Sequence, residues 1–106
     1  MTQPAFLFVR ARVLDPKQFA LYVRGVGPLT AKYGGHYRVL GGTQTVLEGD
    51  WTEDWRIVIS EWPSREAALT FWNSSEYVEL KKLREGAAEA TVLLLDGQAS
   101  IELDRA

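Results

Sequence analysis

The sequence predicts one α+β domain whose elements follow in the order βαββαβ, with the strands forming a four-stranded antiparallel sheet. Four short segments alternate apolar and polar residues with the period of a strand. Longer segments after the first and third strands place apolar residues three and four positions apart, as helices do. This order is that of the ferredoxin-like arrangement. Right-handed crossovers then put the first and third strands in the centre of the sheet and the helices on one face.

The first half of the chain predicts a strand followed by a helix. Residues 6–13 alternate, with Leu7 facing the helices and Phe8 facing the other way. Asp15-Pro16 is a typical helix start, because aspartate accepts the unpaired backbone N–H groups and proline fits the first helical position. Gly27-Pro28 predicts a kink or a brief restart, and Gly34-Gly35 ends the helix.

The second half is expected to repeat this pattern and then return to the sheet. Ser64 is a natural N-cap for one helix, and Ser74 or Ser75 caps the helix that follows it. The expected elements are a strand at 36–40 with an extended continuation at 43–48, a strand at 56–62, helices at 65–72 and from 75 to about 88, and a strand at 91–95. In the second strand, Tyr37 and Val39 are expected on one face and the other residues on the opposite face. The side chains of Lys81, Lys82, Arg84 and Glu85 are expected to point to solvent.

One domain is expected at 1–97, and the tail at 98–106 is either an added strand or disordered.

The composition argues against several classes of binding partner and site. A net charge of -2 gives no electrostatic footprint for a nucleic acid, and the absence of cysteine removes disulfides and thiolate metal sites. No apolar run reaches the roughly 20 residues that cross a bilayer, so we expect a cytoplasmic protein without membrane contact.

The uncovered face of the predicted sheet points to self-association. With both helices on one side, the other side carries Phe6, Phe8 and further apolar residues. An exposed apolar patch of this size normally marks an interface. A two-fold partner would cover it, so the sequence predicts an isologous homodimer.

A set of residues spread over most of the chain resembles a bacterial domain-of-unknown-function family. That family belongs to the dimeric α/β-barrel superfamily, together with the antibiotic-biosynthesis-monooxygenase-like and muconolactone-isomerase-like proteins. The matching residues are Asp15-Pro16, Tyr22, Pro28, Tyr33-Gly34-Gly35, Glu48-Gly49, Arg56, Glu61, Pro63-Ser64, Ala68, Trp72, Ser74, Tyr77 and Arg84. The resemblance implies two ferredoxin-like protomers that face each other, with a cavity between sheet and helices in each. It implies no particular chemistry, and His36 departs from the residue type expected at its position.

Glu48 and Glu61 are the first candidates for acid–base chemistry. Both fall on strands expected to be neighbours, and a carboxylate that points into a cavity must find a partner or change its pKa. Arg56 is a candidate contact for an anionic group of a substrate. The alternative is that such Glu–Arg pairs only stabilise the dimer or a loop.

Aromatic residues and the single histidine complete the candidate site. Tyr22, Tyr77 and Trp72 are expected to line a pocket or simply to belong to the core. Trp51 and Trp55 form either a flap over the pocket or a plug at the end of the sheet. His36 is a candidate general base or haem ligand, or else an exposed residue at the start of a strand.

The sequence therefore predicts a homodimer that binds a small organic molecule. Any catalysis would be cofactor-free proton-transfer or oxygenase-type chemistry, and we expect no metal site, because no second histidine or cysteine stands at ligand spacing. The alternatives are a non-catalytic binding or scaffold protein and, less favoured, haem binding through His36.

Overall fold

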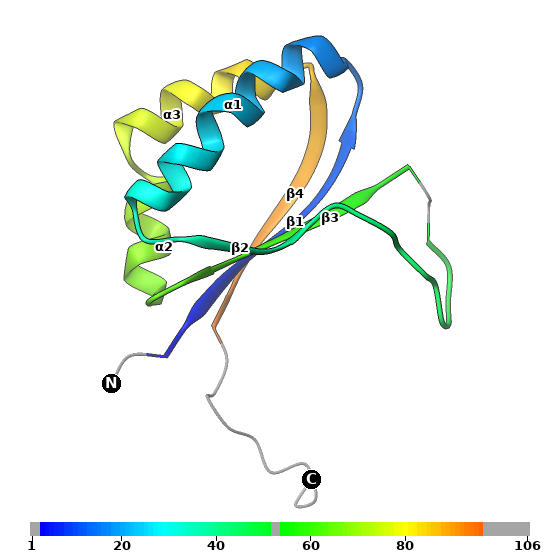
Figure 1. Cartoon of the computed structure of the whole chain (residues 1–106), viewed down its shortest axis with the longest axis horizontal. Coiled ribbons are helices and arrows are strands. Elements are labelled where there is room, and N and C mark those ends of the chain that lie inside the picture. Colours follow the sequence, from blue (N-terminus) through cyan, green and yellow to red (C-terminus); the bar gives the residue numbers. More distant parts are fainter. Residues whose placement is uncertain (1–2, 52–53, 97–106) are drawn as a thin grey trace, which may run out of the picture.

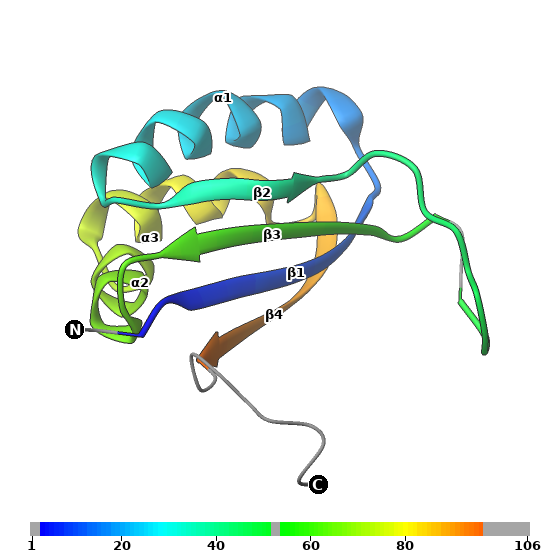
Figure 2. The same cartoon turned by 60° about the horizontal axis from the view of Figure 1, so that its bottom comes forward.

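The computed structural model describes residues 3–51 and 54–96, and these residues form the ferredoxin-like fold that the sequence predicts. The sheet order is β2-β3-β1-β4, and every neighbouring pair is antiparallel (Figure 2). The elements are β1 (Ala5–Val13), α1 (Pro16–Lys32), β2 (His36–Leu40), β3 (Arg56–Trp62), α2 (Arg65–Trp72), α3 (Ser75–Lys81), the short 3₁₀ helix η1 (Lys82–Arg84) and β4 (Ala88–Asp96). The tail at 98–106 lies outside the described residues.

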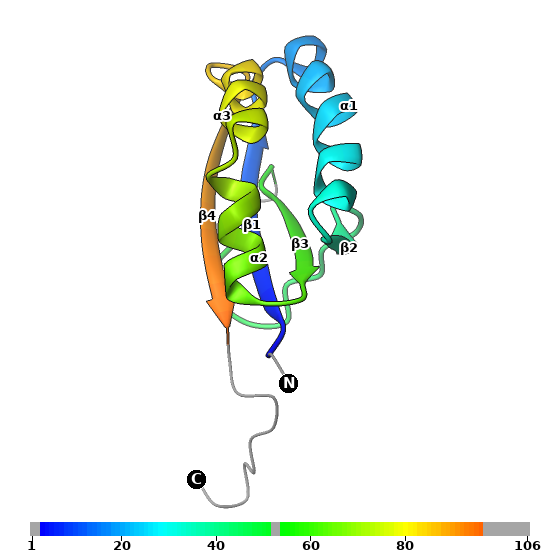
Figure 3. The same cartoon turned by 90° about the vertical axis from the view of Figure 1, so that its left-hand side faces the viewer.

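All helices lie on one face of the sheet (Figures 1 and 3). On the central strand β1, Leu7 is buried beneath them, whereas Phe6 and Phe8 pair with Glu61 and Ile59 on the opposite face. Residues 41–51, which follow β2, extend away from the body of the fold (Figure 1). No helix among the described residues is long and apolar enough to cross a membrane.

Each α-helix begins at the polar residue that the sequence indicates. Asp15 Oδ1 accepts the backbone N–H of Gln18 at 3.2 Å, and Ser64 Oγ accepts that of Ala67 at 3.1 Å. Ser74 Oγ caps α3 in the same way. These side chains satisfy backbone donors that the first turn of a helix leaves without an intrahelical partner.

The α1 helix runs through Gly27 and Pro28 without a restart and ends at Lys32, just before Gly34 takes a positive φ of 92°. Other predicted boundaries were wrong. The α3 helix stops at Lys81, and after η1 the positive φ of Gly86, 77°, turns the chain into a strand that starts at Ala88. No strand forms at 43–48. Gly41 and Gly42 both take positive φ, which directs the chain out of the sheet after the Gly41 N–H donates to the Ile57 carbonyl at 3.0 Å.

A β-bulge interrupts the regular alternation of β2. Tyr37 pairs with Ser60 and Val39 pairs with the next residue of β3, Ile59, so Arg38 is the extra residue. The bulge reverses the faces expected for the end of the strand. Val39 shares the uncovered face with Ile59, and Leu40 faces the helices opposite Val58.

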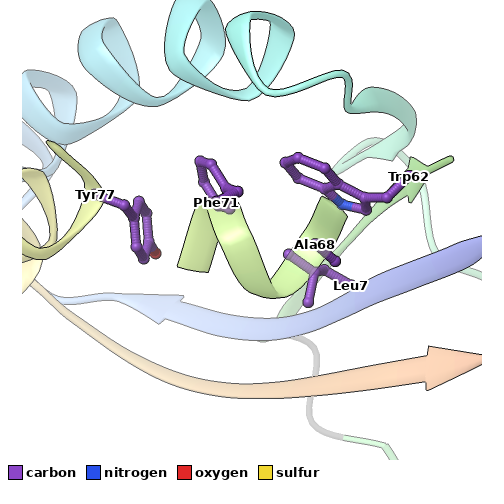
Figure 4. Packing of buried hydrophobic residues seen from close by; sticks show 5 residues of the cluster. All are labelled: Leu7, Trp62, Ala68, Phe71 and Tyr77. Carbon is purple, nitrogen blue, oxygen red and sulfur yellow. The ribbon is translucent and has the colours of Figure 1, made fainter. Parts of the chain in front are cut away.

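The core is aromatic and lies between α2 and the sheet. Trp62, Phe71 and Tyr77 form a continuous stack, with ring centroids 4.7 Å apart between the first two and 4.5 Å apart between the last two (Figure 4). Gly35 permits this packing, because a Cβ there would lie 2.7 Å from Thr30 Cγ2 and 2.8 Å from the Trp62 ring. The stack fixes the wall of the cavity described next.

Candidate ligand cavity

A cavity of about 250 Å³ lies between the inner face of the sheet and the helices. Its floor comes from alternate residues of the strands, among them Val9, Val58 and Val92, and its roof comes from α1. Nearly all of the lining is aliphatic or aromatic. The resemblance implied a hollow in this place, and the geometry is that of a site for an apolar molecule.

The lining is most exposed at one residue of α1 and one of β2. Among the lining residues, Val23 and Leu40 are the large apolar side chains with much of their surface open to solvent, 50% and 69%. Leu40 is the last residue of β2, immediately before the segment that leaves the sheet. The cavity is therefore less covered by protein at these two residues than at the aromatic core.

Hydroxyl groups supply most of the polar atoms of the lining, and they bond to one another. The hydroxyls of Tyr22 and Tyr77 lie 2.9 Å apart, and Thr30 Oγ1 lies 3.1 Å from the Tyr37 hydroxyl. Burial raises the pKa of the Tyr22 phenol far above its ordinary value of 10.0, and the neighbouring Tyr77 adds to this effect. Tyr22 is therefore a neutral hydrogen-bonding group rather than a base.

Arg84 is the charged side chain of the lining. It is half-buried, and its guanidinium carbon lies 5.6 Å from the centre of the Tyr22 ring. Burial acts to lower the pKa of Arg84, but its interactions with Tyr77 and Tyr22 outweigh this and raise the pKa above its ordinary value. The group is a permanent cation at one end of an otherwise apolar space.

Three of the sequence-predicted site residues line this cavity, namely Tyr22, Trp72 and Tyr77. Trp72 packs on Tyr77 with 5.1 Å between ring centroids, and Lys81 Nζ lies 4.7 Å from the centre of the Trp72 ring. Tyr22, Trp72 and Tyr77 thus line the cavity and also pack in the hydrophobic core. The two roles that the sequence left open for these side chains do not exclude each other.

The predicted carboxylates lie elsewhere. Glu61 projects from the uncovered face of β3, where its Oε1 accepts the Arg38 Nε–H at 2.9 Å. The expectation of a Glu–Arg pair inside the cavity was wrong, because the residues that line the cavity from β3 are Val58, Ser60 and Trp62, and Glu61 falls between two of them. Glu48 is exposed in the segment between β2 and β3.

The remaining candidates also lie outside the cavity. His36 is exposed opposite Glu61, in a shallow groove that it shares with Pro4 and Pro63. Haem coordination by His36 would have to take place in that groove. Arg56 is exposed at the start of β3, with its Nη1 3.3 Å from the Trp55 carbonyl oxygen.

The two tryptophans of the loop do not cover the cavity. Trp55 is half-buried beneath two arginines of β1, with the guanidinium carbons of Arg10 and Arg12 at 4.4 Å and 5.2 Å from its ring. Trp51 is also half-buried, and its Nε1 is a buried donor without a hydrogen-bond partner among the described residues. Neither contributes to the cavity lining. Of the two alternatives for this pair, the flap over the cavity is not formed.

Arg84 is the cavity residue that sequence reasoning missed, because it was assigned to the solvent-exposed charged run. A signal was present. Arg84 stands seven positions after Tyr77, which is two helical turns, so both fall on the same stripe.

Among the described residues, no group of three or more His, Cys, Asp or Glu side chains comes together as a metal site would require.

Comparisons with known proteins agree with the fold. A protein of unknown function from Rhodopseudomonas palustris is 24% identical, with a TM-score of 0.69 over 94% of this chain and 86% of that one. SnoaB, a cofactor-independent oxygenase from Streptomyces nogalater, is 12% identical, with a TM-score of 0.67 over 94% and 98%. Hydroxynitrile lyase from Passiflora edulis is 18% identical, with a TM-score of 0.65 over 96% and 100%. No curated protein matches the sequence. The domain of unknown function DUF1330 matches residues 4–98, and the chain belongs to that family.

Proposed function

We propose that this protein binds a small organic molecule in the cavity between the sheet and the helices. The observation that carries the proposal is a largely apolar space of about 250 Å³ with a few polar groups at defined positions. An engineered apolar cavity of about 150 Å³ holds a benzene molecule, whereas sites for drug-sized ligands begin at roughly 300 Å³. The ligand should therefore be a ring or a branched chain with one or two substituents.

Gly27 allows a direct test, because it lines the cavity and a Cβ there would meet no atom within 4 Å. Gly27→Leu should fill part of the space, and Gly27→Ala is the matched control that gains helix propensity without filling it. Binding of toluene, phenol and phenylacetate can be followed through the fluorescence of Trp62 and Trp72, both of which line the cavity. We expect Gly27→Leu to lose the binding that Gly27→Ala retains. Equal binding by both variants, or no binding by the wild type, would refute the proposal.

A second candidate is cofactor-free catalysis on the bound molecule. The observation in its favour is the Tyr22–Tyr77 hydroxyl pair beside Arg84, since such donors stabilise a developing enolate. Against it, the described residues that line the cavity include no aspartate, glutamate or histidine to take a proton, and Glu48, Glu61 and His36 lie outside. Binding is therefore the function that the geometry of one protomer supports best.

We also propose that the working unit is a homodimer that buries the uncovered face of the sheet. The centre of that face is apolar, and ion pairs such as Arg38–Glu61 stand at its margin. Leu93 and Leu95 are 48% and 47% exposed there, which is unusual for apolar residues in the outward row of a strand. The other apolar residues of this face are Phe6, Phe8, Val39, Ile57 and Ile59.

The oligomeric state can be tested with two charge substitutions of matched exposure. Leu93→Lys places a cation in the centre of the proposed interface, whereas Val78→Lys, at a residue that is 44% exposed on α3, places one on the helical side. Light scattering should show a dimer for the wild type and for Val78→Lys and a monomer for Leu93→Lys. A monomeric wild type at high concentration would overturn this proposal and leave the cavity proposal standing.

A further inference from the structure

We propose that the ligand of the cavity is a small monocarboxylate, with its carboxylate at Arg84 and the hydroxyls of Tyr22 and Tyr77 and its apolar body against the aliphatic lining. This inference rests on the proposed ligand-binding function and adds the chemical class of the ligand. It is argued from charge balance, from the hydrogen-bonding capacity of the three side chains and from the rigidity of the turn that holds the arginine.

The charge of the cavity is unbalanced. Arg84 is half-buried, and none of the ion pairs among the described residues includes it. Its neighbours are the hydroxyls of Tyr22 and Tyr77. A partly buried cation without a counter-ion is costly, and one carboxylate in the cavity would neutralise it. A neutral ligand would leave this cost in place.

The two tyrosines have a donor to spare. Their hydroxyls carry two protons, and the 2.9 Å bond between them uses one. The other proton is available to an acceptor in the cavity, and the Arg84 guanidinium offers several N–H donors beside it. Together these groups present a cation and several hydrogen-bond donors, which suits a carboxylate better than an ammonium.

The position of Arg84 is fixed by backbone contacts on both sides of its turn. Gln18 Nε2 donates to the Leu83 carbonyl at 3.0 Å, and the backbone N–H groups of Leu14 and Asp15 both donate to the Ala87 carbonyl, at 2.8 Å and 3.0 Å. The turn is thereby tied to the start of α1. An arginine whose backbone is held in this way needs less ordering when an anion arrives, which favours binding.

The lining on β1 and β4 supplies the apolar surface for the body of the ligand. Val9, Ala11, Ala90 and Val92 face the cavity from these strands and offer only carbon atoms. A body that fits this surface is a phenyl ring or a branched aliphatic chain of similar size. Phenylacetate combines such a ring with one carboxylate, and phenylacetamide has nearly the same shape without the charge.

The test compares these two compounds by titration calorimetry. We expect the wild type to bind phenylacetate about tenfold to a hundredfold more tightly than phenylacetamide, because hydrogen bonds to a charged group contribute that much. Arg84→Gln should abolish the difference, and Arg84→Lys should keep part of it. Lys82→Gln is the matched control, since it removes the same charge from an exposed position in the same turn.

The outcomes separate this inference from the proposed function. If the wild type binds the amide as tightly as the acid, or if Arg84→Gln keeps the preference, the carboxylate inference is refuted while the cavity remains a binding site. If Lys82→Gln reduces the preference as much as Arg84→Gln does, overall charge is the cause and the inference fails. Binding of neither compound refutes the inference, and the Gly27 variants then decide the function. Tyr22→Phe replaces Arg84→Gln if that variant does not fold, and it should weaken phenylacetate binding more than phenylacetamide binding.

Discussion

Gly35→Ala should destabilise the protein although it adds only one methyl group. Gly35 joins α1 to β2, and its added Cβ would lie 2.7 Å from Thr30 Cγ2 and 2.8 Å from two atoms of the Trp62 ring. Both neighbours are fixed. Thr30 and Trp62 are 2% and 1% exposed, and the Trp62 Nε1–H donates to Ser60 Oγ at 2.9 Å. Neither side chain can swing into solvent to make room.

The expected cost is that of overpacking a rigid core, about 1–3 kcal/mol in the free energy of unfolding. For a domain of this size each kcal/mol lowers the melting temperature by roughly 4–8 °C, so the midpoint should fall by about 5–20 °C. The backbone of Gly35 adds nothing to this, because its φ is not positive. Displacement of Thr30 should also disturb its bond to Tyr37 in the cavity.

Thermal unfolding followed by circular dichroism measures the effect. Gly27→Ala is the control, because a methyl group there meets no neighbour and a helical glycine costs about 1 kcal/mol relative to alanine. Gly27→Ala should therefore melt slightly above the wild type and Gly35→Ala well below it. A Gly35→Ala variant that melts at the wild-type temperature or above would show that the packing around Trp62 is not rigid.

Three further predictions concern a helix cap and two titrations. Ser64→Ala should lower the free energy of unfolding by about 1 kcal/mol in urea titrations, because it removes the cap of α2. Ser64→Asp should keep most of the wild-type stability, because a carboxylate can accept the same backbone hydrogen bond. Hydrogen bonds from Lys32 and from a tyrosine hydroxyl hold the pKa of Glu76 below its ordinary value of 4.5, so this carboxylate stabilises the fold above pH 4.5 and the contribution is lost as pH falls through the lowered pKa. Glu76→Gln should flatten the acid limb of a stability–pH profile, and an unchanged limb would refute this. Burial raises the pKa values of Tyr22 and Tyr37, so part of the phenolate absorbance should appear only well above pH 10 and should appear earlier when the protein is unfolded.

Local sequence signals were sufficient for the fold. Asp15, Ser64 and Ser74 cap the helices where the sequence indicates, because the cap is an interaction among residues close in the chain. The faces of β1 followed in the same way from alternation, with Leu7 under the helices and Phe8 on the far side. The family resemblance and the order of the elements led to one architecture, which the comparisons confirm.

The candidate site was predicted less well, because it depends on which of two faces a residue takes. Glu61 stands between Ser60 and Trp62, both of which are buried, so its own side chain must leave on the other side. Both faces of β3 are partly apolar, and the sequence alone did not show which one the helices cover. Arg84 was missed for a different reason. A charged residue in a run of charges normally faces solvent, and only the stripe that it shares with Tyr77 indicated the cavity.

The bulge at Arg38 also determines which side chain at the end of β2 lines the cavity. In a regular strand that kept all five residues, Val39 would join Tyr37 in the inward row and Leu40 would lie on the outward face. The bulge places the leucine in the cavity lining and the valine on the uncovered face instead. Deletion of Arg38 would remove the bulge and leave both side chains on their present faces, because Val39 already pairs with the neighbour of Ser60. Straightening the strand with all five residues retained would exchange them, so the size of the cavity and the surface offered to a second copy would change together.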